Sequence, residues 1–261
     1  MTVVRKLAAG LATLAAAVIA SVGIAQADGA AARKAAPVAA PTSWSGLYFG
    51  AHAGWAWADV DSEFVTATGV PLGFNDSVDF DAPVVGGQIG IQHQFGLFVL
   101  GIEGSATFAY EDGYGNVFCP NPARTCGKRF DNVLSVGPRL GYAMGKWMPY
   151  LTGGYASAEI AHKSHNNGFA PVPPTTGDPL LFGQRFNGWY IGAGVDMALA
   201  QGWTVGLEYR HYDFGSDTVQ TFSPLGVPSG EFRNVEPTLD TIALRVSWKL
   251  GRPEPVAKPM K

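Results

Sequence analysis

The sequence predicts an all-β protein, an eight-stranded antiparallel up-and-down transmembrane β-barrel, and three observations support this fold class. Eight segments carry apolar residues at every second position, which is the period of a strand with one apolar face. The faces in between are rich in glycine, and 15% of the 261 residues are charged while 47% are hydrophobic. Short and long links alternate, so a meander places long extracellular loops at one end and short periplasmic turns at the other.

The expected strands are each about ten residues long, which suits a tilted strand that crosses a membrane. The segment from 147 is ambiguous in phase, and Pro149 weakens it unless the proline opens the strand. The strands are expected at about 47–57, 85–94, 98–108, 134–142, 147–158, 188–199, 203–210 and 241–250. The long links between them are expected at about 58–81, 111–129, 159–185 and 214–237.

The first 27 residues are predicted to be a secretory signal peptide. Arg5 and Lys6 precede a charge-free, Ala-rich run over 7–24, and the small-residue cleavage sequence AQA follows at 25–27. A transmembrane anchor at 1–27 is the alternative, because the run is about long enough to span a bilayer.

The remaining chain divides into a barrel and two flanking segments. Residues 28–43 are rich in Ala and Pro and are expected to form a periplasmic linker. Residues 251–261 are rich in Pro and Lys and are expected to form a periplasmic tail. The barrel is therefore expected over 44–250.

The two cysteines fit an exported protein. Cys119 and Cys126 lie in one polar stretch with Pro and Gly, where an oxidising compartment favours a disulfide between them. A metal pair is the alternative, but no His or second cysteine pair lies beside them to complete a tetrahedral site.

A period of two does not distinguish a membrane barrel from a soluble ligand-binding barrel, because both alternate. The glycine-rich face is a poor soluble surface but suits the crowded interior of a narrow barrel. Aromatic residues also fall near the strand ends, as two interfacial girdles require. They are Trp55, Trp57, Tyr110, Tyr142, Trp147, Trp189, Trp203 and Trp248.

Four segments resemble the small outer-membrane β-barrel proteins of alphaproteobacteria, a porin-like group with an opacity-type or outer-membrane-protein-A-like barrel. This Gram-negative group includes surface antigens and haemin-binding proteins, and the resemblance implies a cell outer membrane location with both termini periplasmic. One departure is that the last strand ends at Trp248-Lys249-Leu250, eleven residues before the end, whereas members usually end on an aromatic residue that the barrel-insertion machinery reads. The segments are SWSGLYFGAHAGWAW (43–57), VVGGQIGIQHQF (84–95), PYLTGGYA (149–156) and FNGWYIGAGVDMAL (186–199).

Strand parity places three acidic and three basic residues inside the barrel. Charges in a narrow, low-dielectric lumen must be paired, so we expect a closed ionic plug. A catalytic carboxylate pair and a conducting pore are the alternatives. The six residues are Glu103, Arg139, Asp196, Glu208, Arg210 and Arg245.

The long links hold two candidate ligand sites. Asp59, Asp61 and Glu63 are oxygen-rich ligands of the kind that a divalent cation prefers, but a solvated strand extension whose charge blocks edge association is the favoured interpretation. His162 and His165, with His211, could ligate haemin iron as in some relatives, but no pattern marks an axial ligand.

The expected function is that of a structural, surface-exposed barrel that supports envelope integrity. Its expected partners are outer-membrane lipid, lipopolysaccharide, the barrel-insertion machinery and, through the amino terminus at Asp28 or nearby lysines, peptidoglycan. A narrow porin, or a haemin- or host-surface-binding protein, is the alternative. A net charge of -3 argues against nucleic-acid binding, and no catalytic motif stands in a usable context, so neither an enzyme nor a firm cofactor is expected.

Overall fold

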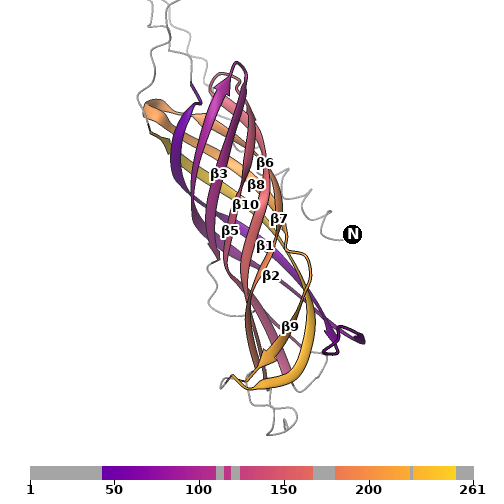
Figure 1. Ribbon diagram of the computed structural model, residues 1–261. Coiled ribbons are helices and arrows are strands. Elements are labelled where there is room, and N and C mark those ends of the chain that lie inside the picture. The colour runs from indigo at the N-terminus through magenta and orange to yellow at the C-terminus, as the bar shows by residue number, and fades with distance from the viewer. Residues whose placement is uncertain (1–42, 110–114, 119–123, 167–179, 224–225, 251–261) are drawn as a thin grey trace, which may run out of the picture. The chain divides into compact units, whose positions relative to one another are not determined.

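The backbone of the computed structural model is an antiparallel sheet that closes on itself (Figure 1). The structure describes residues 43–109, 115–118, 124–166, 180–223 and 226–250. The predicted signal peptide, most of the linker and the predicted tail lie outside these ranges. Within them, no helix has the length and apolarity needed to cross a membrane.

Eight of the ten strands form a ring in the order β1-β2-β3-β5-β6-β7-β8-β10. Strand β10 pairs with β1 from Lys249 opposite Tyr48 to Phe232 opposite Val65, and this pairing closes the ring. The predicted eight-stranded up-and-down barrel is confirmed. The strands are β1 (Gly46–Val65), β2 (Pro71–Phe95), β3 (Phe98–Ala109), β4 (Gly115–Phe118), β5 (Arg124–Tyr142), β6 (Trp147–Asn166), β7 (Leu180–Ala198), β8 (Trp203–Asp213), β9 (Asp217–Phe222) and β10 (Pro228–Lys249), with a short 3-10 turn at Ala200–Gly202.

The outward face of the ring carries the predicted apolar belt. Ile91, Leu151 and Leu244 are 56%, 60% and 62% exposed. A belt of apolar side chains exposed in this way is stable in lipid and not in water. Exposed aromatic residues lie near both ends of this belt, and Tyr110 lies outside the described ranges. Tyr142, Trp147 and Trp203 are close to the short turns, while Trp55, Trp57 and Trp189 lie at the other end.

The strands run further than the sequence predicted, and the long loops are shorter. Strand β1 continues to Val65 and β2 begins at Pro71, so most of the expected link at 58–81 is a strand hairpin. The alternation persists but its polarity inverts, with Val60 buried inside and Asp59 exposed outside. Above the membrane the outer face meets water instead of lipid, and a search for outward apolar residues therefore ends the strand too early.

A β-bulge on β5 also changes which residues face inward. The register of β5 against β6 shifts between Phe130 and Asn132. Lys128 and Phe130 are buried on one side of the bulge, and Val133 is buried on the other. The inward parity of β5 is therefore even before the bulge and odd after it, because the extra residue rotates the strand.

Beyond the ends of β3 and β8 the described strands pair in two groups. One group is β9-β10-β1-β2 and the other is β4-β5-β6-β7. Leu181 of β7 pairs with Phe222 of β9 across one junction, where Gln184 also donates to Asp217 at 2.6 Å. The part of the barrel above the membrane is therefore a continuation of the ring in which side chains connect the two groups.

Candidate functional site

Six charged side chains meet inside the part of the barrel that crosses the membrane. Three carboxylates face three guanidinium groups, so their formal charges cancel. A charged side chain that is buried without a partner lowers the stability of a protein by several kcal/mol. Pairing each carboxylate with a guanidinium group avoids this penalty. All six are buried: Glu103 on β3, Arg139 on β5, Asp196 on β7, Glu208 and Arg210 on β8, and Arg245 on β10.

Glu103 and Glu208 share the same two arginines. Arg210 lies 2.6 Å from one oxygen of Glu103, and Arg245 lies 2.5 Å from the other. The Nε atom of Arg210 lies 2.8 Å from Glu208, and Nη1 of Arg245 donates to the second Glu208 oxygen. The result is a closed ring of alternating charge that connects β3, β8 and β10.

A further ion pair lies beside this ring. Arg139 contacts Asp196 at 2.6 Å and also donates to Oε1 of Gln92 at 3.3 Å. Its guanidinium lies 3.6 Å from the ring centre of Tyr150, within the range of a cation-π contact. Since Asp196 is on β7, Gln92 on β2 and Tyr150 on β6, Arg139 connects its own strand β5 to three other strands of the ring.

Two tyrosines complete the network, and the sequence analysis missed both. Tyr48 donates to Glu103 at 2.7 Å, and Tyr150 donates to Glu208 at 2.9 Å. With Tyr48 on β1, all eight strands of the ring contribute a side chain. The sequence offers a signal for Tyr48, which has the inward parity of its segment, but not for Tyr150, because the phase of the segment from 147 is ambiguous.

Inward glycines make room for these tyrosines. Gly90 lies opposite Tyr48 in the β1–β2 register, and Gly194 lies opposite Tyr150 in the β6–β7 register. A Cβ atom at either glycine would collide with the tyrosine hydroxyl. The glycine excess therefore has a specific cause here, since each phenol lies across the backbone of the neighbouring strand.

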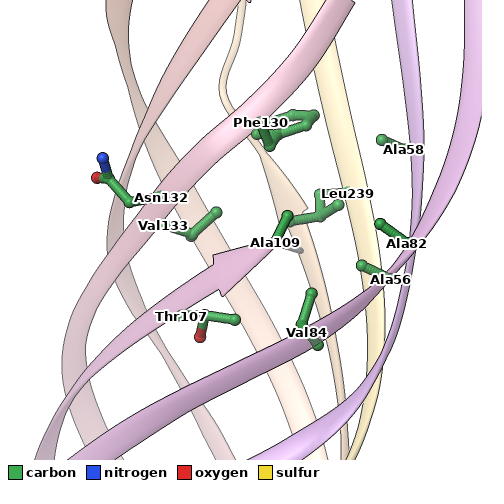
Figure 2. Close-up of a pocket in the computed structure, with 10 residues that line it drawn as sticks. All are labelled: Ala56, Ala58, Ala82, Val84, Thr107, Ala109, Phe130, Asn132, Val133 and Leu239. Atoms are coloured by element: carbon green, nitrogen blue, oxygen red, sulfur yellow. The ribbon is translucent and has the colours of Figure 1, made fainter. Parts of the chain in front are cut away.

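Above the ionic network the interior becomes apolar. Buried Ala, Val, Phe and Tyr side chains from the ring strands fill this level, and Phe130 and Tyr212 are among them. They leave a cavity of about 20 Å³, beside which the short side chains of Ala56, Ala82 and Ala109 lie (Figure 2). A cavity of this size holds about one water molecule. The apolar side chains therefore nearly fill the lumen at this level.

A second ionic cluster lies higher, in the part of the barrel above the membrane. Asp76 of β2 contacts Lys128 of β5 at 3.2 Å and Arg233 of β10 at 2.7 Å. Lys128 also donates to Ser62 Oγ at 2.6 Å and to the Val60 carbonyl at 2.9 Å. Burial lowers the pKa of Lys128, and the neighbouring Asp76 carboxylate opposes this shift. The cluster thus connects the two groups of strands.

The predicted disulfide reaches this second cluster. Cys126 of β5 is disulfide-bonded, and its expected partner Cys119 lies outside the described residues. Arg233 Nη2 lies 3.8 Å from Cys126 Sγ. The buried Cys126 sulfur therefore lies beside the Arg233 guanidinium of the cluster.

The acidic candidates of the first long link lie on the outer face of β1. Asp59 and Asp61 are exposed and Glu63 is partly exposed, so the three carboxylates occupy every second position of the strand. Partial burial and repulsion from Asp61 and Asp79 raise the pKa of Asp59. Among the described residues, no group of three His, Cys, Asp or Glu side chains is arranged to hold a metal ion.

Two of the three histidine candidates, His162 and His211, lie on opposite faces of the barrel wall. His162 is fully buried on β6, opposite Lys128 in the register, instead of lying in a loop. His165 is on the same strand three positions later, and its side chain lies outside what the structure describes. His211 is on the outer face of β8, where its Nδ1 lies 2.9 Å from Asp240.

A closed ring with an apolar outer belt and a charged interior defines an outer-membrane β-barrel protein. The chain belongs to the outer membrane protein beta-barrel domain family, whose model matches residues 12–249. The 25 kDa outer-membrane immunogenic protein of Brucella ovis is 28% identical over 187 residues, which cover 69% of this chain and 77% of that protein. The 31 kDa outer-membrane immunogenic protein of Brucella melitensis is 29% identical over 213 residues, covering 72% and 80%.

Solved outer-membrane barrels are also similar. The outer membrane protease OmpT of Escherichia coli has a TM-score of 0.47 and 9% identity, covering 78% of this chain and 97% of that chain. The outer membrane protein OprG of Pseudomonas aeruginosa has a TM-score of 0.43 and 14% identity, with the same coverages of 78% and 97%.

Proposed function

We propose that this outer-membrane barrel is a structural, surface-exposed protein that supports the envelope and whose lumen is closed to solutes. The observation that carries the proposal is the ionic network, to which every strand of the ring contributes. An eight-stranded barrel has an interior about wide enough to be filled by side chains. Here those side chains are paired across the lumen, so a solute would have to break several ion pairs to pass.

The proposal includes no enzymatic role. A carboxylate that acts as a general base must be available to a substrate proton. Glu103 and Glu208 are each held between two arginines and a tyrosine. This arrangement supports a stabilising role for the two side chains.

We also propose that both chain termini are periplasmic and that the belt contacts outer-membrane lipid and lipopolysaccharide. The ends of the ring strands, Gly46 and Lys249, lie at the same end as the short turns after Phe95 and Tyr142. A protease site inserted after Thr68 should be cut in intact cells, whereas one placed in the tail at 251–261 should be protected. Cleavage of the tail site alone would reverse the orientation.

Single-channel recording in planar bilayers tests the closed lumen. The native barrel should show no conductance steps, because the ion pairs and the apolar level above them occupy the lumen. The Glu103→Gln/Glu208→Gln variant, which leaves two arginines without carboxylates, should show openings. Steps of hundreds of picosiemens from the native protein would instead establish a porin.

A further inference from the structure

The residues that precede β1 leave the barrel wall at the end that carries the short turns, here called the turn end. Strand β1 begins at Gly46, whose φ is +138°, a backbone conformation that favours glycine. Trp44, two residues earlier, is only 2% exposed. The chain therefore bends at Gly46, and the large Trp44 side chain is buried although it lies before the first strand.

Trp44 lies across the mouth of the lumen at the turn end. It belongs to one buried apolar cluster with Val99 of β3, Ala143 after β5 and Met148 of β6. Strand β6 is the fourth strand from β1 in either direction around the ring of eight, so the cluster reaches the opposite wall. Val99 precedes Glu103 on β3, which places this apolar closure between the short turns and the ionic network.

Side-chain hydrogen bonds hold the segment 43–45 to the wall. Gln94 Oε1 accepts from the Trp44 backbone N–H at 2.9 Å, and Gln92 Nε2 donates to the Trp44 carbonyl at 2.7 Å. No backbone-to-backbone hydrogen bond joins this segment to a strand in the part of the chain that the structure describes. The segment can therefore separate from the wall without breaking the ladders that close the ring.

One polar group of Trp44 is unsatisfied in this position. Its indole Nε1–H is buried and has no hydrogen-bond partner among the described residues. A buried donor without a partner is unfavourable, because water would accept its hydrogen bond on exposure. Burial of the apolar ring and loss of this hydrogen bond therefore act in opposite directions on the position of Trp44.

Gln92 connects Trp44 to the ionic network. Its Nε2 atom donates to the Trp44 carbonyl, while its Oε1 atom accepts from Arg139 at 3.3 Å. Arg139 in turn contacts Asp196 at 2.6 Å. When Trp44 moves away, the Gln92 amide loses the bond that orients it, and the position of its contact to Arg139 is no longer fixed.

We propose that Trp44 is a hinged plug, which closes the lumen at the turn end and leaves it while the barrel stays folded. Gly46 is the hinge, at the end of an element where hinges commonly lie, and Gln92 and Gln94 hold the plug in place. A pull on the preceding chain acts on this segment before it reaches the strands. The inference rests on the closed lumen proposed above and makes that closure reversible from the turn end.

Fluorine NMR tests the plug directly, with the chain from residue 28 labelled with 5-fluorotryptophan and folded in phosphatidylcholine nanodiscs. The chain contains seven tryptophans, and the Trp44 resonance is the one that Trp44→Phe removes. In the native protein this resonance should shift little between H₂O and D₂O, because the ring is buried. Gly46→Ala should at least double that shift and leave the other six resonances in place, because alanine rarely adopts the φ of Gly46.

A second variant releases the plug without touching the hinge. Gln92→Met/Gln94→Met removes the side-chain hydrogen bonds to Trp44 and should also at least double its H₂O–D₂O shift. The matched control is Gln220→Met on β9, far from the turn end, which should leave the Trp44 resonance unchanged. Heat-modifiable gel migration verifies that each variant is folded, and either variant serves alone if the other fails to fold.

Single-channel recording tests the consequence for the lumen. Added to Glu103→Gln/Glu208→Gln, the substitution Trp44→Ala should raise the open probability at least threefold, because it removes the plug from an already weakened network. The matched control is Trp203→Ala at the same end of the barrel, where the tryptophan is 46% exposed on the outer face. This control should change the open probability less than twofold.

Three results would overturn the plug. The first is a native Trp44 shift as large as that of the unfolded chain, and the second is an unchanged shift in every folded hinge or glutamine variant. The third is an equal open probability with and without Trp44→Ala in a background that conducts. Conductance of the native barrel that Trp44→Ala increases would refute the closed ionic network and support the plug, so the two proposals fail separately.

Discussion

Replacing Glu103 by Gln changes one charge of the lumen network and nearly preserves its shape. Glutamine keeps the side-chain length and an oxygen that can accept the hydrogen bond from Tyr48. The lumen then holds three guanidinium groups and two carboxylates. Arg210 and Arg245 keep their contacts to Glu208, so the variant measures the contribution of one carboxylate and its two ion pairs.

The size of the effect follows from the geometry. Two guanidinium groups contact Glu103 at 2.6 and 2.5 Å, which places the charge centres roughly 4 Å apart. At an effective dielectric constant of about 20 each attraction is worth about 4 kcal/mol. The carboxylate also carries a desolvation penalty of several kcal/mol that disappears with its charge. We therefore expect the free energy of unfolding to fall by about 3–5 kcal/mol.

A compensating variant distinguishes the charge from the shape. Glu103→Gln/Arg245→Gln leaves two carboxylates and two guanidinium groups, with Arg139 paired to Asp196 and Arg210 paired to Glu208. The double variant should be more stable than Glu103→Gln alone. The coupling energy between the two positions should be about 1–3 kcal/mol.

Urea unfolding in lipid vesicles, followed by the gel mobility of the folded barrel, measures both variants. A matched control is Gln94→Glu, which adds a carboxylate at the half-exposed rim beside the short turns and should change the unfolding free energy by less than about 1 kcal/mol. The reasoning is refuted if Glu103→Gln unfolds within about 1 kcal/mol of the native protein. It is also refuted if the effects of the two single substitutions simply add.

Three further predictions concern other levels of the barrel and use the same unfolding assay. Asp76→Ala should lower stability by about 3–5 kcal/mol because it leaves two buried cations without their carboxylate, whereas Lys128→Met should have a smaller effect because Asp76 keeps its second cation. Leu244→Arg should destabilise by about 2–4 kcal/mol on the lipid face, and Glu236→Arg, outward on the same strand above the belt, by less than about 1 kcal/mol. Gly194→Val should reduce the folded fraction, because its side chain collides with the phenol opposite it; normal folding of this variant would contradict the proposed role of the glycine.

The sequence predicted the barrel well because membrane strands obey one simple constraint. Outward residues must be apolar and inward residues must fit a narrow lumen, so Ile91 and Leu244 are correctly placed from parity alone. The same parity brought Glu103, Arg139 and Arg245 into the lumen. It also explained the low charge content, since charged side chains are absent from the lipid belt in the part of the chain that the structure describes.

The alternation of a strand predicts its facing wrongly where the surroundings or the register of the strand change. Asp59 and Asp61 continue the alternation of β1, but the outer face there meets water, so the strand looked like a loop. Counting back from Leu134 of β5 would place Lys128 outside, and the bulge after Phe130 places it inside instead. The second ionic cluster was therefore missed.

The sequence by itself determined the fold class, the facing of the strands within the membrane and the balance of charge in the lumen. Only the tertiary structure decided which charges pair, because Arg210 and Glu103 meet across the barrel from strands that share no ladder. It also decided that Tyr48 and Tyr150 lie over glycines and that Asp76 connects two groups of strands. The physical reason is that alternation depends on each strand and its surroundings, whereas pairing across a lumen depends on register and closure, which arise only when all eight strands meet.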